Sequence, residues 1–145
     1  MTRLPLSLLP DSAVVDARGR LHIGGCDLLE LAAEYGTPLF VYDEVHLRAR
    51  CREAVAAFGD DVAYASKAFL CKAMARLAHE EGMRIDVATG GELHVALAAG
   101  VPASRLVLHG NNKSEAELAR ALAERVGLIV IDSLDELRRI EQLVT

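Results

Sequence analysis

The feature that most constrains the fold of this chain is an even repeat of short apolar segments in its carboxyl-terminal two thirds. These segments occupy residues 62–66, 84–88, 105–109 and 128–132. Their first residues lie 22, 21 and 23 positions apart, a spacing that accommodates one strand and one helix in each unit. We therefore predict an α/β fold of about four βα units, with parallel strands and right-handed connections.

Signals for helix starts and ends lie between these segments. Thr89, Ser114 and Ser133 are each followed three residues later by glutamate. This pattern predicts a capping box, in which the hydroxyl and the carboxylate each accept a hydrogen bond from a free N–H group of the first turn. Glycine is the residue that most readily adopts the left-handed conformation after a helix. The expected helix ends are therefore Gly82, Gly100 and Gly127.

The first 60 residues have a different pattern. Alternating residues at 13–23 surround the turn Arg18-Gly19-Arg20 and predict a hairpin or a pair of edge strands. Asp27 is expected to cap the next helix, and Gly36 to end it. The remaining predictions are a helix over 28–35, a short β segment at 38–42 and a helix over 43–58. We divide the chain into an N-terminal β segment and helix, 1–36, and a partial β/α barrel, 37–145.

Two parallel architectures fit four such units: a doubly wound sheet and part of an eight-stranded barrel. No Gly-x-Gly-x-x-Gly follows any of the predicted strands, so the dinucleotide-binding fingerprint is missing. The even spacing favours a barrel of the TIM type, which needs eight strands and roughly 250 residues. The 145 residues hold about half of one. We expect either that the chain is an incomplete form of a longer protein or that another element completes it.

Composition excludes several classes of function. The chain has 16 Lys+Arg against 21 Asp+Glu, a net charge of −5 that argues against a nucleic-acid-binding surface. No apolar run approaches the roughly 20 residues that span a bilayer, and the first ten residues are a poor signal peptide. The three cysteines form neither a disulfide framework nor a metal-ligand pattern. We predict a cytoplasmic protein with free thiols and without a metal site.

Candidate functional residues lie where the predicted strands end, because parallel β/α folds gather their functional groups at that edge. Lys67 follows the first strand among small neighbours that leave room beside its amine. Partial desolvation there would favour the neutral amine, which can attack a carbonyl group. The alternative, which the residue type alone favours, is a lysine that reaches solvent or pairs with a carboxylate such as Asp86.

The segment Tyr64-Ala-Ser-Lys-Ala-Phe69 resembles the pyridoxal-phosphate attachment signature of the alanine-racemase-like (fold-type III) decarboxylases. It has the aromatic residue three positions before the lysine and small residues on both sides of it. Asp86-Val-Ala-Thr-Gly-Gly-Glu-Leu93 and His109-Gly-Asn-Asn-Lys-Ser114 are similar to the second and third strand-end loops of the diaminopimelate decarboxylase family. Residues 131–136 resemble the fourth, so the resemblance extends from about Val14 to the end.

This resemblance implies an N-terminal β/α barrel followed by a C-terminal β-domain, which residues 13–23 would join. Lys67 would bind pyridoxal 5'-phosphate covalently and act in catalysis, and Asp86 and His109 would line the cofactor side of the barrel mouth. The reaction would be decarboxylation of the amino acid meso-diaminopimelate to L-lysine, in lysine biosynthesis, by a homodimer. The family's ring-stacking histidine and glycine-rich phosphate loop have no counterpart in the 145 residues. We therefore expect no activity from this chain alone.

Three alternatives stay open. The chain could belong to an ornithine- or arginine-type decarboxylase, or be a non-catalytic half-barrel that binds and regulates a full-length decarboxylase. It could also be an unrelated doubly wound phosphate-binding domain. The polar loop of Asn111, Asn112 and Lys113 is also open, because it could turn the chain or contact a ligand. Gly90 and Gly91 precede a helix and could bind an anion, but we interpret them as packing and capping residues.

Overall fold

The computed structural model describes residues 5–144. They form two compact units that divide between Arg50 and Cys51, within helix α2 (Glu44–Phe58). This division differs from the predicted one between residues 36 and 37, which was drawn from expected barrel membership and stays a prediction. No helix of the described residues is both long and apolar enough to cross a membrane.

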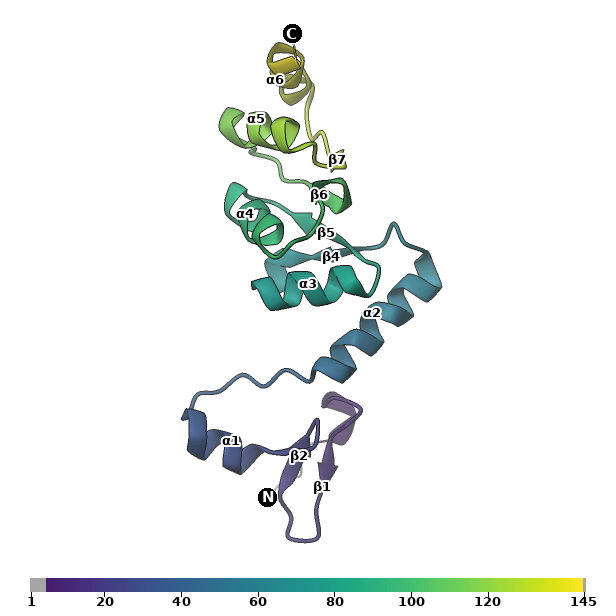
Figure 1. Cartoon of the computed structure of the whole chain (residues 1–145), viewed down its shortest axis with the longest axis vertical. Helices are drawn as coiled ribbons and strands as arrows, with labels where there is room; N and C mark the ends of the chain where they lie inside the picture. The colour runs from purple at the N-terminus through teal and green to yellow at the C-terminus, as the bar shows by residue number, and fades with distance from the viewer. Residues whose placement is uncertain (1–4, 145) are drawn as a thin grey trace. The chain divides into compact units, whose positions relative to one another are not determined.

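The first unit contains a small antiparallel sheet and helix α1 (Figure 1). The predicted hairpin is confirmed: β1 (Val14–Val15) pairs with β2 (Leu21–Ile23). A third strand, β3 (Cys26–Asp27), extends it and was not predicted. Gly24 and Gly25 connect β2 to β3 with φ of +59° and +80°. This two-residue Gly-Gly turn is typical of a tight hairpin and is the signal that would have predicted β3.

The prediction for helix α1 (Leu28–Tyr35) is confirmed at both ends. The Asp27 carboxylate accepts hydrogen bonds from the backbone N–H groups of Leu29 and Glu30, and Gly36 ends the helix with a φ of +81°. The β segment predicted at 38–42 is wrong, since these residues belong to no strand. An apolar run becomes a strand only where a neighbouring strand supplies a hydrogen-bond ladder, and no described strand pairs with this one.

The second unit is a four-stranded parallel sheet with the strand order β4-β5-β6-β7 (Figure 1). Consecutive strands are neighbours throughout, so the chain crosses the sheet in one direction, as in a barrel. A doubly wound sheet would reverse direction at a switch point. The strands are β4 (Ala63–Ala65), β5 (Arg84–Val87), β6 (Leu106–Leu108) and β7 (Leu128–Ile129), and they confirm the four predicted positions. The unit is the N-terminal part of a (β/α)8 barrel.

Helices connect the strands and cover the sheet with small side chains. The α-helices of this unit are α3 (Lys72–Glu80), α4 (Gly90–Ala98), α5 (Glu115–Glu124) and α6 (Leu134–Val144), and its short 3-10 turns are η2 (Ser66–Ala68) and η3 (Ala103–Arg105). Another 3-10 turn, η1 (Leu6–Leu8), lies in the first unit. Leucine and valine from β5 and β6 pack with fully buried alanines of the helices, and these small residues allow the helices to lie close to the sheet. The fully buried residues of this core include Ala75, Ala78, Ile85, Val87, Ala96, Leu106, Leu108 and Ala121.

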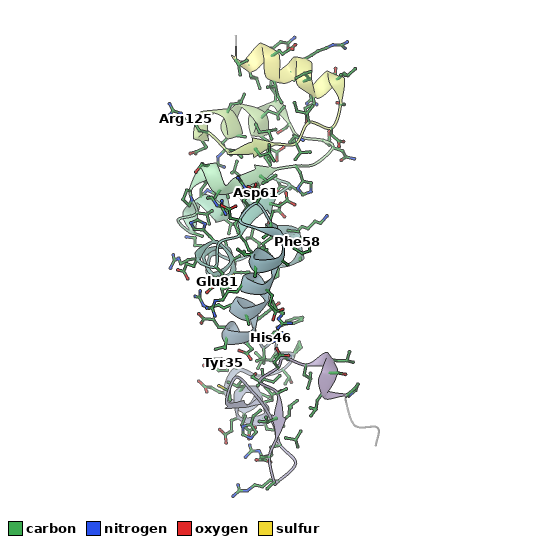
Figure 2. The ribbon with its side chains drawn as sticks, turned by 90° about the vertical axis from the view of Figure 1, so that its right-hand side faces the viewer. Tyr35, His46, Phe58, Asp61, Glu81 and Arg125 are labelled. Carbon is green, nitrogen blue, oxygen red and sulfur yellow. The ribbon has the colours of Figure 1, made fainter. Side chains whose placement is uncertain are left out.

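Gly127 does not have its predicted role. Helix α5 ends instead at Arg125, which adopts the left-handed conformation with a φ of +60° (Figure 2). Gly127 lies where two backbone segments meet: a Cβ atom added to it would be 2.1 Å from the carbonyl oxygen of Ser104. The glycine is therefore required by close packing against the turn before β6, not by the end of the helix.

The third predicted capping box forms only in part. The boxes at Thr89 and Ser114 are complete. At α6 the Ser133 hydroxyl accepts from the backbone N–H of Glu136, but the Glu136 carboxylate accepts from the backbone N–H of Asp132. That carboxylate also pairs with Lys113, 3.0 Å away, so a tertiary partner competes for the group that a local motif would use.

Candidate functional site

The two edges of the parallel sheet differ in chemistry. At the amino-terminal edge arginines bind the preceding loops: Arg84 Nη2 lies 2.8 Å from Asp61 Oδ1, and Arg105 Nη2 donates to the Gly82 carbonyl at 2.6 Å (Asp61 is labelled in Figure 2). At the carboxyl-terminal edge lie Lys67, Asp86 and His109. The first edge is closed by internal hydrogen bonds, and the second presents an amine, a carboxylate and an imidazole.

Lys67 lies in η2, directly after β4, and its side chain is exposed. Among the residues that the structure describes, none forms a hydrogen bond or ion pair with its ammonium group. The turn around it is held by Tyr64, whose hydroxyl donates to the Phe69 carbonyl at 2.6 Å. This bond gives the aromatic position of the attachment signature a physical role, because it closes the loop that carries the lysine.

Asp86 and His109 come together on the neighbouring strands. Asp86 lies in β5, opposite Ala65 of β4 and Val107 of β6, and His109 directly follows β6. The His109 ring accordingly reaches Asp86, with a hydrogen bond between Nδ1 and Oδ1. Both side chains are partly exposed. The carboxylate of Asp86 therefore pairs with histidine, and the ion pair with Lys67 that we considered does not form.

Ser66 is a second polar residue beside the lysine. Its side chain is 1% exposed, and its hydroxyl has no hydrogen-bond partner in the described part of the chain. A buried hydroxyl without a partner costs about 1–3 kcal/mol. An unpartnered buried hydroxyl at a strand end points to a ligand. The sequence alone did not distinguish Ser66 from the other small residues around the lysine.

The N-terminus of α4 is already occupied by carboxylates. Glu92 accepts from the backbone N–H groups of Ala88 and Thr89, and Glu117 of the next helix accepts from the N–H of Gly90 at 2.7 Å. A helix N-terminus binds anions through these same N–H groups. The interpretation as a packing and capping residue is thus supported for Gly90, where an added Cβ would lie 3.2 Å from Glu117, and this turn is not a free phosphate site. Gly91 has no such close contact, so packing does not require a glycine there.

Two helices each bind the unit before them through a glutamate and an arginine three residues later, a pair that we call the Glu-x-x-Arg clamp. On α5, Glu117 accepts from Gly90, and Arg120 Nη1 lies 3.5 Å from the Gly90 carbonyl. On α6, Glu136 pairs with the Lys113 ammonium, and Arg139 Nη1 donates to the Lys113 carbonyl at 2.9 Å. The capping glutamates therefore also connect neighbouring βα units, which the local motif alone does not indicate.

Lys113 is buried and bonded inside the protein. Its side chain is 1% exposed, whereas Asn111 and Asn112 are exposed. The sequence allows two interpretations of this polar loop, a turn of the chain or a ligand contact. For Lys113 the burial favours the first, structural role. The two asparagines stay available to a ligand.

The carboxyl groups of both clamps are acidic beyond their ordinary range. Hydrogen bonds from the backbone N–H groups of Ser114 and Gly90 lower the pKa of Glu117, against a smaller opposing effect of burial. Burial is the largest influence on the pKa of Glu136 and raises it, but hydrogen bonds from Asp132 and Lys113 and the positive charges of Lys113 and Arg139 lower the pKa overall. Both glutamates are therefore bound as anions.

Acid is consequently expected to destabilise the fold through Glu117. A pKa that is lower in the folded state than the ordinary 4.5 adds stability above that pH, and the contribution is lost as pH falls through the folded value. Between about pH 5 and 3, Glu117→Gln should show a shallower loss of unfolding free energy than the parent, as measured by urea unfolding. Glu124→Gln, at the exposed end of the same helix, is the control. An unchanged slope in Glu117→Gln would contradict the expectation.

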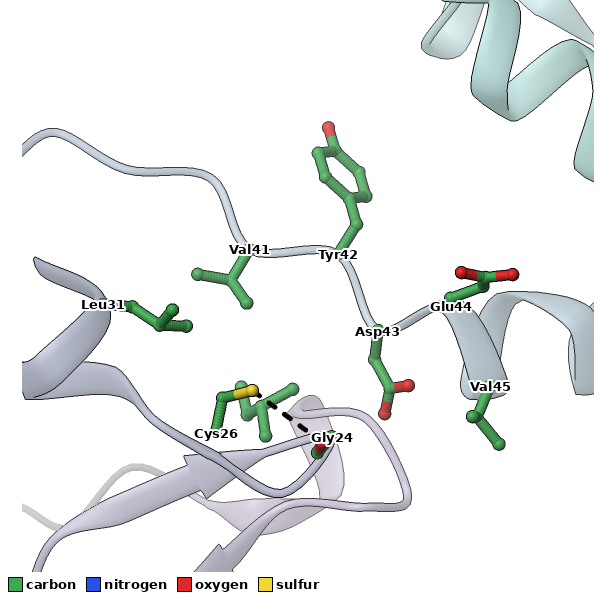
Figure 3. Close-up of a pocket in the computed structure, with 9 residues that line it drawn as sticks. Gly24, Cys26, Leu31, Val41, Tyr42, Asp43, Glu44 and Val45 are labelled. Carbon is green, nitrogen blue, oxygen red and sulfur yellow. Dashed lines mark hydrogen bonds between the residues drawn. The ribbon is translucent and has the colours of Figure 1, made fainter. Parts of the chain in front are cut away.

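A pocket of about 240 Å³ lies elsewhere, in the first unit (Figure 3). It is lined by the β2–β3 turn, by Leu31 of α1 and by residues 41–45. Leu31 and Val41 contribute apolar surface, and Asp43 a carboxylate that already binds Ser12. It contains none of the three predicted site residues. Within residues 5–144, no group of three or more His, Cys, Asp or Glu is arranged to hold a metal ion.

The chain is similar to a known family of proteins. Residues 44–145 match the pyridoxal-binding domain of the pyridoxal-dependent decarboxylases. Diaminopimelate decarboxylase of Mycobacterium tuberculosis is 50% identical over 145 residues, which cover 99% of this chain and 32% of that protein. The Bacillus subtilis enzyme of the same name is 52% identical over 130 residues, covering 86% of the chain and 30% of that protein.

A solved structure is similar as well. Diaminopimelate decarboxylase from M. jannaschii in complex with L-lysine superposes with a TM-score of 0.83 and 32% identity, covering 92% of this chain and 33% of that one. The chain spans about a third of the length of the curated relatives it matches. The similarity therefore covers only a part of each relative, and the residues that match the family, 44–145, include Lys67, Asp86 and His109.

Proposed function

Because this chain belongs to the pyridoxal-dependent decarboxylases and forms part of their pyridoxal-binding domain, we propose that the full-length protein decarboxylates meso-diaminopimelate to L-lysine. The observation that carries the proposal is the exposed amine of Lys67 at one strand end, beside the Asp86–His109 pair on the next two strands. The similarity to diaminopimelate decarboxylases at 50% identity supports this substrate over ornithine and arginine.

The residues present fit the aldehyde end of pyridoxal phosphate. Lys67 has an exposed primary amine without a partner among the described residues, and we assign to it the covalent attachment of the cofactor. The unpartnered hydroxyl of Ser66 lies next to it in sequence. When bound, the cofactor supplies an electron sink for the charge that the departing carboxylate leaves behind.

Asp86 fixes the protonation of the His109 ring. An ionised carboxylate can only accept a hydrogen bond, so Nδ1 of His109 carries the proton of the bond to Asp86. In the neutral ring, Nε2 is then left as an acceptor. We assign to this pair the orientation of the cofactor side of the site. We do not assign the phosphate to the N-terminus of α4, since Glu117 already binds the N–H of Gly90.

The substrate assignment is tested with the purified full-length protein and added pyridoxal phosphate. We expect L-lysine and carbon dioxide to form from meso-diaminopimelate, while ornithine and arginine give at most a trace of their amines, as measured by chromatography. Formation of putrescine or agmatine at a comparable rate would contradict the assignment and identify an ornithine- or arginine-type decarboxylase.

We further propose that the full-length protein is a cytoplasmic homodimer, and that the β1-β2-β3 sheet joins a C-terminal β-domain. Cys26 and Cys71 form no disulfide among the described residues, which supports a reducing compartment. Several exposed apolar residues of the first unit, among them Val14, Val15 and Phe40, are surface that further chain or a partner would cover.

A further inference from the structure

Lys113 is a buried lysine whose charge is fully used inside the fold. Its Nζ atom lies 2.5 Å from the Gly110 carbonyl oxygen, 2.8 Å from that of Val130 and 3.0 Å from Oε2 of Glu136. Lys113 is 1% exposed and Glu136 is 2% exposed. Lysine is almost never buried to this extent unless it is paired, and here three acceptors match its three donor protons.

We propose that Lys113 is a positioning residue for the strand-end site: it holds the Gly110 peptide and so keeps His109 against Asp86. The inference rests on the proposed function for its catalytic meaning, but its geometric content concerns only this chain. The ammonium binds the carbonyl of the residue directly after His109. Lys113 itself touches neither Asp86 nor the His109 ring in any hydrogen bond of the described residues.

The His109 backbone is held from both sides. On its amino side, the His109 N–H donates to the Val87 carbonyl at 2.9 Å and extends the β5–β6 ladder. On its carboxyl side is Gly110, whose φ of +117° places it in a region that side-chain-bearing residues rarely adopt. Glycine can adopt many backbone conformations, so a further contact is needed to hold the Gly110 carbonyl in one orientation. Lys113 supplies it through the Gly110–Asn111 peptide. In our proposal this contact fixes the chain just after His109 and so helps to keep the ring against Asp86.

The charges suit a positioning role better than a purely stabilising one. An apolar pair of similar volume is often as stabilising as a buried ion pair, because burying two charges costs much of what their attraction gains. An ammonium group adds hydrogen bonds, which fix the orientation of the carbonyl groups that it binds. It connects the loop after β6, the end of β7 and the first turn of α6 at one point, and an apolar side chain would contact them without fixing a carbonyl.

The test compares full-length variants that differ in this network. Lys113→Met/Glu136→Gln removes both charges together, and the glutamine keeps an acceptor for the Asp132 N–H. Selective ¹⁵N-histidine labelling reports the His109 ring, assigned with His109→Gln, and Asp86→Asn supplies the signature of a lost pair. We expect the double variant to fold, with a urea midpoint no higher than that of the parent because the Gly110 and Val130 carbonyls lose their donor, while its His109 signal moves toward that of Asp86→Asn. An unchanged His109 signal in a folded double variant would overturn the proposal.

The single variant Glu136→Gln tests separately whether Lys113 or Glu136 positions His109, and it can be used if the double variant fails to fold. It leaves the bonds from Lys113 to Gly110 and Val130 in place, so we expect the His109 signal of the parent. A moved signal would show that Glu136, and not Lys113, positions the ring. Lys72→Met, an exposed lysine at the start of α3, is the matched control for loss of a lysine.

Kinetics of the same variants separate this inference from the proposed function. In the double variant we expect kcat for decarboxylation to fall about tenfold to a hundredfold with little change in KM, the effect of a misplaced group. A KM effect alone would contradict positioning. If the parent protein decarboxylates none of the substrates, the proposed function fails, yet the ¹⁵N comparison still decides whether Lys113 holds His109.

Discussion

The Lys67→Ala variant of the full-length protein is expected to lose decarboxylation by about 10³-fold or more, because removing the covalent attachment residue removes the group that exchanges with the substrate amine. Other elements of the fold should be unaffected. Lys67 is exposed, and the loop around it is closed by Tyr64 and Phe69, not by the lysine. The urea midpoint should therefore equal that of the parent.

The attachment itself can be measured without activity. The protein is mixed with pyridoxal phosphate, reduced with borohydride and digested, and the adduct is located by mass spectrometry. We expect one stoichiometric label on Lys67, absent in Lys67→Ala and retained in the control Lys72→Ala. Lys113 should stay unlabelled because it is buried. Labels spread equally over Lys67 and Lys72 would contradict a defined site.

The Gly127→Ala variant is expected to lower the free energy of unfolding by about 3 kcal/mol, the upper range for overpacking a tight contact. The new Cβ atom would lie 2.1 Å from the carbonyl oxygen of Ser104 and 2.7 Å from its carbon. Both atoms belong to the backbone, so no side chain can rotate away. The contact lies beside β6 and β7, and one of these strands would have to shift.

Gly91→Ala is the matched control for this substitution. Gly91 lies in the first turn of α4, and an added Cβ would meet only the Thr89 hydroxyl oxygen, 3.8 Å away. Alanine favours a helix over glycine by roughly 1 kcal/mol, so this variant should be as stable as the parent or slightly more stable. Urea unfolding of both full-length variants checks the pair. Equal midpoints for Gly127→Ala and Gly91→Ala would contradict the close-packing argument.

The parts of the fold that follow from local chemistry could be predicted from the sequence. The strand–helix period gave four parallel strands in their observed positions, and the capping boxes at Thr89 and Ser114 form as expected. The ends of parallel strands meet at one edge, so Asp86 and His109 could be assigned to the same side before any contact was known. Their direct pairing required the register, which places Asp86 beside Val107, two residues before His109.

The parts that depend on distant partners could not be predicted. Glu136 has the sequence of a capping residue, but a lysine 23 positions earlier binds its carboxylate. Lys113 appears polar and loop-like in the sequence, and its burial follows only from the positions of Val130 and Glu136. Gly127 resembles a helix end, yet the Ser104 backbone leaves no room for a side chain there, and Arg125 ends the helix instead.

The direction of the Glu-x-x-Arg clamps has a consequence for biosynthesis. Both clamps reach backward along the chain, from α5 to Gly90 and from α6 to Lys113. A ribosome makes the chain from its amino terminus, so each loop emerges before the helix that fastens it. The His109 loop lacks its last anchors until Val130, Glu136 and Arg139 have left the exit tunnel. The loops after β5 and β6 therefore gain these contacts only after the following helix has been made.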